Sequence, residues 1–88
     1  MEPSQIIPHL QQQLGFNAEV FKQGTLYYQH AVEAKLDKKH NPLVVACASL
    51  YVYCRRHGMN ITMTHICNII PITREELMNA YEDVRRIV

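Results

Sequence analysis

The sequence lacks both a long hydrophobic run and a basic amino terminus, the two features that would mark membrane insertion or secretion. Its longest apolar stretch, from Leu43 to Cys54, has twelve residues. A membrane-spanning helix needs about 20. Near the amino terminus Glu2 stands where a signal peptide would carry basic side chains. We therefore expect a soluble protein that is not secreted.

Cysteine is scarce, and the spacing of the cysteines matches no common disulfide or metal-binding motif. Cys47, Cys54 and Cys67 are odd in number and form no C-x-x-C pair, which argues against a disulfide framework and against a zinc ribbon. The histidines do not add the spacing of a structural zinc site. We expect reduced thiols, no metal, and a nuclear location, or a cytoplasmic one if the source is a prokaryote or a cytoplasmic virus.

Excess charge and catalytic motifs are also lacking. Nine Lys and Arg against eight Asp and Glu give a net charge of +1, whereas bulk affinity for phosphate needs many cations acting together. The chain has no glycine-rich phosphate loop and no Cys and His arrangement with an orienting third group. We expect neither enzyme activity nor a cofactor. At 88 residues the chain is predicted to form a single domain, residues 1–88.

Helix signals dominate the sequence that remains. The stretch from Leu43 to Cys54 holds eleven apolar residues and one serine, and a helix that is apolar all round is normally the centre of a bundle. Pro42 suits its first position and Gly58 its left-handed end. The fold class is therefore all-α, a five-helix bundle with the third helix central. The expected helices are Ser4 to Leu14, Asn17 to Leu36, Pro42 to the stop at Gly58, Thr62 through Ile69, and Thr73 onward.

The second helix is expected to pack through one apolar face. Asn17 is a good N-cap, and Gly24 is placed to allow close approach of another helix. The segment DKKHN is expected to be a loop before the third helix. The face predicted to enter the core consists of Phe21, Thr25, Tyr28, Val32 and Leu36.

The last two helices have the form of a helix-turn-helix. Thr62 is an N-cap for the first of them, and Thr73 with Glu76 three positions later is a capping box for the second. A tight turn between a short helix and an amphipathic one is the general form of this motif. The apolar stripe of the final helix comprises Leu77, Ala80, Tyr81, Val84 and Val88.

These features together resemble one repeat of the transcription factor IIB family. The resemblance covers Asn41 to Val84 and follows a buried helix of the form P-x-x-V-A-x-A-x-x-Y, a basic exit, a Thr-capped short helix and a Thr-capped helix that ends in A-Y. Before Asn41 the chain matches the family only in length and helix count. The positions in register are Pro42, Val45, Ala46, Ala48, Tyr51, Thr62, Ile66, Ile72, Thr73, Leu77, Ala80 and Tyr81.

The resemblance implies a five-helix cyclin-like domain that acts as a transcription-initiation adaptor. Such a factor joins promoter DNA and the TATA-binding protein to RNA polymerase and has no enzyme activity. The resemblance places the start of the final helix nearest the DNA, with Arg74 at a phosphate or guanine and Asn79 at a base edge. The DNA-binding residues implied at that helix are Thr73, Arg74, Glu75, Met78 and Asn79.

A second set of candidates comes from the charged and aromatic residues. Five cations could converge on one edge as a phosphate-binding patch, or could simply complement helix carboxyl ends and keep the protein soluble. Tyr27 and Tyr53 are the tyrosines expected to line a groove for a protein partner. The five cations are Lys35, Lys38, Lys39, Arg55 and Arg56.

Three departures from the family pattern weaken the interpretation as a DNA-contacting repeat. Pro71 stands in the turn where the family commonly has glycine, and proline cannot adopt a positive φ. The exposed side of the final helix is acidic, and a single repeat without a zinc ribbon indicates an excised or split piece, or a shortened relative. The alternative is a cyclin-type protein-interaction module that makes no DNA contact. The acidic residues are Glu75, Glu76, Glu82 and Asp83.

Overall fold

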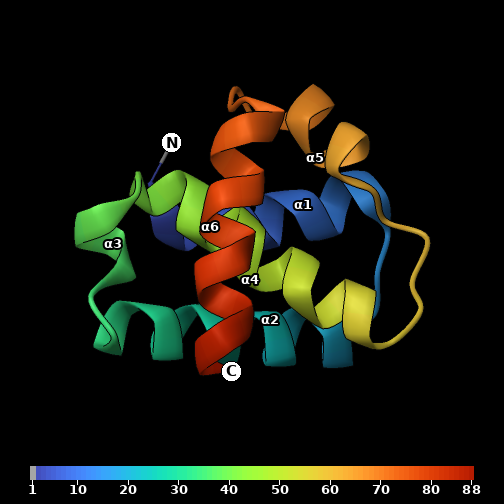
Figure 1. The fold of residues 1–88 in the computed structure, drawn as a ribbon. Helices are drawn as coiled ribbons and strands as arrows, with labels where there is room; N and C mark the ends of the chain where they lie inside the picture. The colour runs from blue at the N-terminus through green and yellow to red at the C-terminus, as the bar shows by residue number, and fades with distance from the viewer. Residues whose placement is uncertain (1) are drawn as a thin grey trace.

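The structure, a computed structural model, describes residues 2–88 and is built of helices joined by turns (Figure 1). No strand occurs in that range, which confirms the all-α prediction. Within the same range no helix has the length and apolar character needed to cross a membrane. The elements are the 3-10 helix η1 (Pro3–Gln5) and the α-helices α1 (Ile6–Leu14), α2 (Ala18–Glu33), α3 (Leu36–Lys39), α4 (Pro42–Arg56), α5 (Met63–Ile69) and α6 (Arg74–Ile87).

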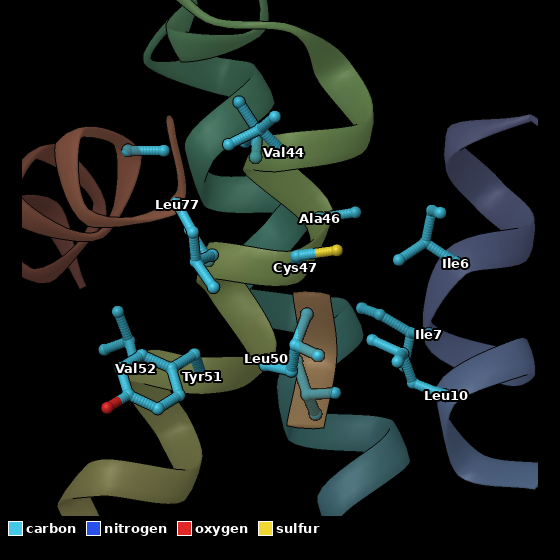
Figure 2. Close-up of a cluster of buried hydrophobic side chains, with 14 of the residues drawn as sticks. Ile6, Ile7, Leu10, Val44, Ala46, Cys47, Leu50, Tyr51, Val52 and Leu77 are labelled. Carbon is cyan, nitrogen blue, oxygen red and sulfur yellow. The ribbon is translucent and has the colours of Figure 1, made fainter. Parts of the chain in front are cut away.

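Helix α4 is the centre of the bundle, as its apolar sequence predicts. Every residue from Val44 to Cys54 is buried. Helices α2 and α6 pack most extensively on α4, and α1, α3 and η1 also contact it. Figure 1 shows α4 enclosed by these helices, with α6 running across it. Figure 2 shows Ile6, Ile7 and Leu10 of α1 pointing toward Cys47 and Leu50 of α4.

The predicted end of α1 and the predicted starts of α2 and α4 are confirmed. Gly15 ends α1 with a φ of 74°, a conformation that glycine adopts without strain. The Asn17 side chain accepts a hydrogen bond of 3.0 Å from the Val20 N–H at the start of α2. The Asn41 side chain accepts one of 2.9 Å from the Leu43 N–H, with Pro42 at the first position of α4.

The segment between α2 and α4 differs from the prediction of a long second helix followed by a loop. Helix α2 ends at Glu33, because Lys35 takes the left-handed conformation with a φ of 63°. The extra one-turn helix α3 follows, with Asp37 in its first turn and lysines in its last, where each charge suits the helix dipole. The break lets Leu36 pack against the core. A non-glycine residue in this conformation has no clear sequence signal.

The face of α2 that enters the core is centred on Gly24, which confirms the close approach predicted there, and it coincides only in part with the predicted apolar face. The buried residues of this helix are Val20, Gly24 and Ala31, whereas Val32 of the predicted face is 37% exposed. Gly24 is the reason for the close contact with α4: a Cβ added there would lie 3.0 Å from Cδ1 of Leu50. The predicted face is partly buried at its Phe21 end and open to solvent at its Val32 end.

Candidate nucleic-acid interface

Both helices of the predicted helix-turn-helix begin with the expected caps. The Thr62 hydroxyl accepts a hydrogen bond of 3.2 Å from the His65 N–H at the start of α5. The Thr73 hydroxyl accepts one of 3.1 Å from the Glu76 N–H, and the Glu76 carboxylate accepts one of 3.0 Å from the Thr73 N–H. These capping boxes fix where α5 and α6 start.

The turn between α5 and α6 accommodates Pro71 without strain. Ile70 and Ile72 are buried on either side of the exposed proline, and the Ile72 N–H donates a 2.7 Å hydrogen bond to the Ile70 carbonyl. This bond closes a three-residue turn whose central residue needs a φ near the value that proline imposes. Within residues 2–88 no residue of this turn has a positive φ. The turn therefore does not need the glycine that the family commonly has.

Helix α6 presents the predicted contact residues to solvent. Leu77, Ala80 and Val84 are buried on one side. Arg74 and Asn79 are both exposed, and they lie about 140° apart around the helix axis. Met78, which lies one turn after Arg74, is 44% exposed. The Thr73 side chain is occupied by the helix cap.

Most of the acidic side chains of α6 are held in contacts within the protein. Glu82 accepts a 2.9 Å hydrogen bond from Nε of Arg85. Asp83 contacts Nζ of Lys39 at 2.9 Å and Nε2 of His40 at 2.7 Å. Glu76 belongs to the capping box described above. Among the described residues, Glu75 is the one acid of α6 without a hydrogen bond or ion pair, so α6 is less repulsive to phosphate than its sequence indicates.

The five predicted cations do not converge on one edge. Lys38 and Lys39 lie on α3 beside the start of α4, whereas Arg55 and Arg56 end α4. The 15 residues of α4 separate the two groups by about 20 Å along its axis. Lys35 is exposed at the break before α3.

Arg56 instead binds the carboxyl end of α6. Its Nη1 donates a 2.7 Å hydrogen bond to the Val88 carbonyl, and its Nη2 donates one of 3.0 Å to the Arg85 carbonyl. The guanidinium carbon also lies 5.6 Å from the centre of the Tyr27 ring. These contacts satisfy carbonyl groups that a helix end leaves free.

Tyr27 and Tyr53 contact each other, and Tyr53 belongs to the core. Their ring centres are 5.8 Å apart in an edge-to-face arrangement, and Tyr53 is buried with a stacked contact to His57. The prediction that Tyr53 lines a partner groove is therefore corrected. A side chain in the middle of an apolar helix is needed for the core.

Helix α3 brings two of the predicted residues together across a hollow of about 220 Å³. Lys39 and Asn79 line it, along with His40 and Glu76. The elements α3 and α6 are in contact. We name the exposed candidates of these two helices together the α3–α6 surface; it consists of Lys38, Lys39, Arg74, Met78 and Asn79. Asn79 is the member on α6 that lines the hollow.

The contact of His40 with Asp83 joins α6 to the end of α3, and sequence reasoning missed it. The two residues are 43 positions apart, so no local pattern could have indicated it. The hydrogen bonds from His40 and then Lys39 lower the pKa of Asp83 below its ordinary value of 3.8. A carboxylate with a lowered pKa stabilises the fold above its unfolded pKa, and this stabilisation is lost as the pH falls through the folded pKa.

We expect Asp83→Asn to lower the free energy of unfolding by about 1.5 kcal/mol at pH 7, because it removes charge-assisted hydrogen bonds. The difference from the wild type should shrink as the pH falls below 3.8 and the native Asp83 becomes protonated. Urea denaturation of both proteins between pH 7 and pH 3 measures this difference in the free energy of unfolding. Glu75→Gln, a matched change at an exposed acid, should have little effect. A wild-type advantage as large at pH 3 as at pH 7 would contradict the role of the charge.

The buried cysteines are not suited to catalysis. Burial raises the pKa of Cys47 to about 12, with a smaller effect from nearby Cys67, and burial raises the pKa of Cys54 to about 11. Both are therefore thiols at neutral pH, and the thiolate is the form that attacks substrates or binds metals. Within residues 2–88 the cysteines are free and no cluster of potential metal ligands is present.

Comparison with known protein families identifies the family of the chain. The family model described as the transcription factor TFIIB repeat matches residues 1–87, which extends well beyond the segment Asn41 to Val84 that carries the resemblance in sequence. No curated protein and no solved structure matches the chain. The helical architecture around α4 is that of the cyclin-like repeat. The chain therefore belongs to the transcription factor TFIIB repeat family.

Proposed function

We propose that this protein is a transcription-initiation adaptor, which positions promoter DNA relative to the TATA-binding protein and RNA polymerase without catalysing a reaction. The match to the TFIIB repeat over residues 1–87 carries this proposal. Such a protein works where its polymerase works, in the nucleus, or in the cytoplasm of a prokaryote or of a cell infected by a cytoplasmic virus.

The α3–α6 surface is the DNA contact in this proposal. Arg74 is exposed in the first turn of α6, where a guanidinium can reach a phosphate or a guanine edge. Asn79 lies on the exposed side of the same helix and has the amide that pairs with adenine. Lys38 and Lys39 on the neighbouring helix α3 would contact the backbone phosphates.

We expect Arg74→Ala to weaken binding to promoter duplex by about 1–2 kcal/mol, or roughly tenfold. The measurement is fluorescence anisotropy of labelled duplex at two salt concentrations, with and without a TATA-binding protein. Binding should fall with salt and strengthen with that partner. Arg55→Ala is the matched control, because Arg55 is an exposed arginine at the far end of α4.

Equal losses from Arg74→Ala and Arg55→Ala would show that overall charge binds the DNA and not the α3–α6 surface. No binding of wild-type protein in any condition would overturn DNA contact and favour the second candidate, a cyclin-type protein-interaction module. The ion pair between Lys39 and Asp83 favours this second candidate, because it holds one cation of the α3–α6 surface in a contact within the protein.

A further inference from the structure

One flank of the apolar stripe of helix α2 is only partly covered by the core. The inner face of α2, with Val20, Gly24 and Ala31, packs toward α4. The flank beside it carries Phe21 and Tyr28, which are partly buried and pack against the core, followed by the exposed Val32. The core therefore leaves the Val32 end of this flank open to solvent.

A hollow of about 230 Å³ lies at the amino-terminal part of this flank. Pro3, Ile7 and Pro8 line it from η1 and α1, and Phe21 and Tyr28 line it from α2. Its volume is below the range of about 300–1,000 Å³ typical of small-molecule sites. The size and the apolar lining suit a large side chain of another protein.

A second, more open hollow continues along α2 toward its carboxyl end. It shares Tyr28 with the first and extends past Val32 to Glu33 and Asp37. Burial and then the nearby charge of Asp37 raise the pKa of Tyr28, in keeping with an acidic environment at this end. The carbonyl groups at the end of α2 add negative partial charge. The charged residues that line the two hollows, within the part of the chain described, are both acids.

We propose that the two hollows form one docking groove, the α2 groove, for an extended segment of a partner protein that carries an apolar side chain and a lysine or arginine. The apolar side chain enters the first hollow between Pro8 and Thr25, and the cation lies against Glu33 and Asp37. This groove is independent of DNA contact, because none of its residues belongs to the α3–α6 surface.

The spacing of the two groups on the partner follows from the helix. Thr25 in the first hollow and Glu33 in the second are eight residues apart, or about 12 Å along the axis. An extended chain covers that distance in about four residues. A second copy of this chain fits less well, because a symmetric contact pairs a surface with itself, and the described lining of the groove has acids but no cation.

The test is a selection of random peptides displayed on phage against the intact protein, with the enriched peptides then synthesised and their affinities measured. We expect enriched peptides to carry an apolar residue and a lysine or arginine about four positions apart. Val32→Ser and Glu33→Lys should each weaken their binding by about tenfold. Both residues are exposed, so the variants should fold, which thermal unfolding verifies. Glu19→Lys, an exposed acid on α2 outside both hollows, should leave binding unchanged.

Three results would overturn the proposal. No enrichment over a blank surface would show that the groove does not hold peptides. Equal affinity of the peptides for the wild type, Val32→Ser and Glu33→Lys would show that the peptides bind elsewhere on the protein. A protein that sediments as a dimer alone, and as a monomer after Val32→Ser, uses this face to bind itself. Because the DNA assay tests Arg74, the failure of either proposal can be recognised separately.

Discussion

We expect Leu50→Ala to lower the free energy of unfolding by about 2–5 kcal/mol, the range for removing a buried leucine side chain. Leu50 is fully buried in the middle of α4, and in Figure 2 it points toward Ile7 and Leu10 of α1. Helices packed on several sides hold the cavity open and leave it little freedom to collapse. Urea denaturation followed by circular dichroism measures the loss as a lower midpoint at an unchanged slope.

Leu26→Ala is the matched control, because it makes the same chemical change on α2 where the leucine is 38% exposed. Its effect should stay within about 0.5 kcal/mol, as is usual for surface substitutions. Equal losses for the two variants would mean that helix propensity and not core packing determines the result. A loss below about 1 kcal/mol for Leu50→Ala would contradict the central position of α4.

The central helix could be predicted from sequence because its signal is local and admits one interpretation. A stretch that is apolar on every side, from Leu43 to Cys54, can be satisfied only by burial all round. Its start at Pro42 and the caps at Thr62 and Thr73 depend on residues within three positions of each other. The fold class and the helix-turn-helix follow from such local patterns.

The orientation of α2 could be predicted only in part, because its apolar stripe is broader than the strip of small residues that meets α4. The larger residues Phe21, Tyr28 and Val32 gave the stronger hydrophobic pattern, yet the core contact is made through Gly24 and Ala31. Close approach of two helices favours small residues, and a count of hydrophobic residues gives them little weight. The break at Lys35, which creates α3, could not be predicted either, because a non-glycine residue in the left-handed conformation has no clear sequence signal.

The candidate site was predicted in part. The exposure of Arg74, Met78 and Asn79 follows from the period of α6 alone. The partners of its charged residues do not, since Asp83 meets Lys39 and His40 through the tertiary fold. The cations predicted to converge lie toward opposite ends of α4. The sequence pattern did not reveal how far apart those two ends are.

We expect Gly24→Val to lower the free energy of unfolding by about 2–3 kcal/mol, toward the upper end for overpacking a core. The new Cβ alone would lie 3.0 Å from Cδ1 of Leu50 and 3.8 Å from Cδ1 of Ile7, and valine adds two methyl groups beyond it. The gain in helix propensity over glycine is only a few tenths of a kcal/mol for a β-branched residue. Urea denaturation again gives the free energy.

Gly24→Ala is the control for the backbone, because alanine gains about 1 kcal/mol of helix propensity and meets mainly the flexible end of Leu50. It should stay within about 1 kcal/mol of the wild type. If α2 and α4 share one space at this contact, Leu50→Ala removes the atom that the valine meets. The double variant Gly24→Val with Leu50→Ala should then be less destabilised than the sum of the two single variants. Strict additivity would show that the two helices do not compete for this space.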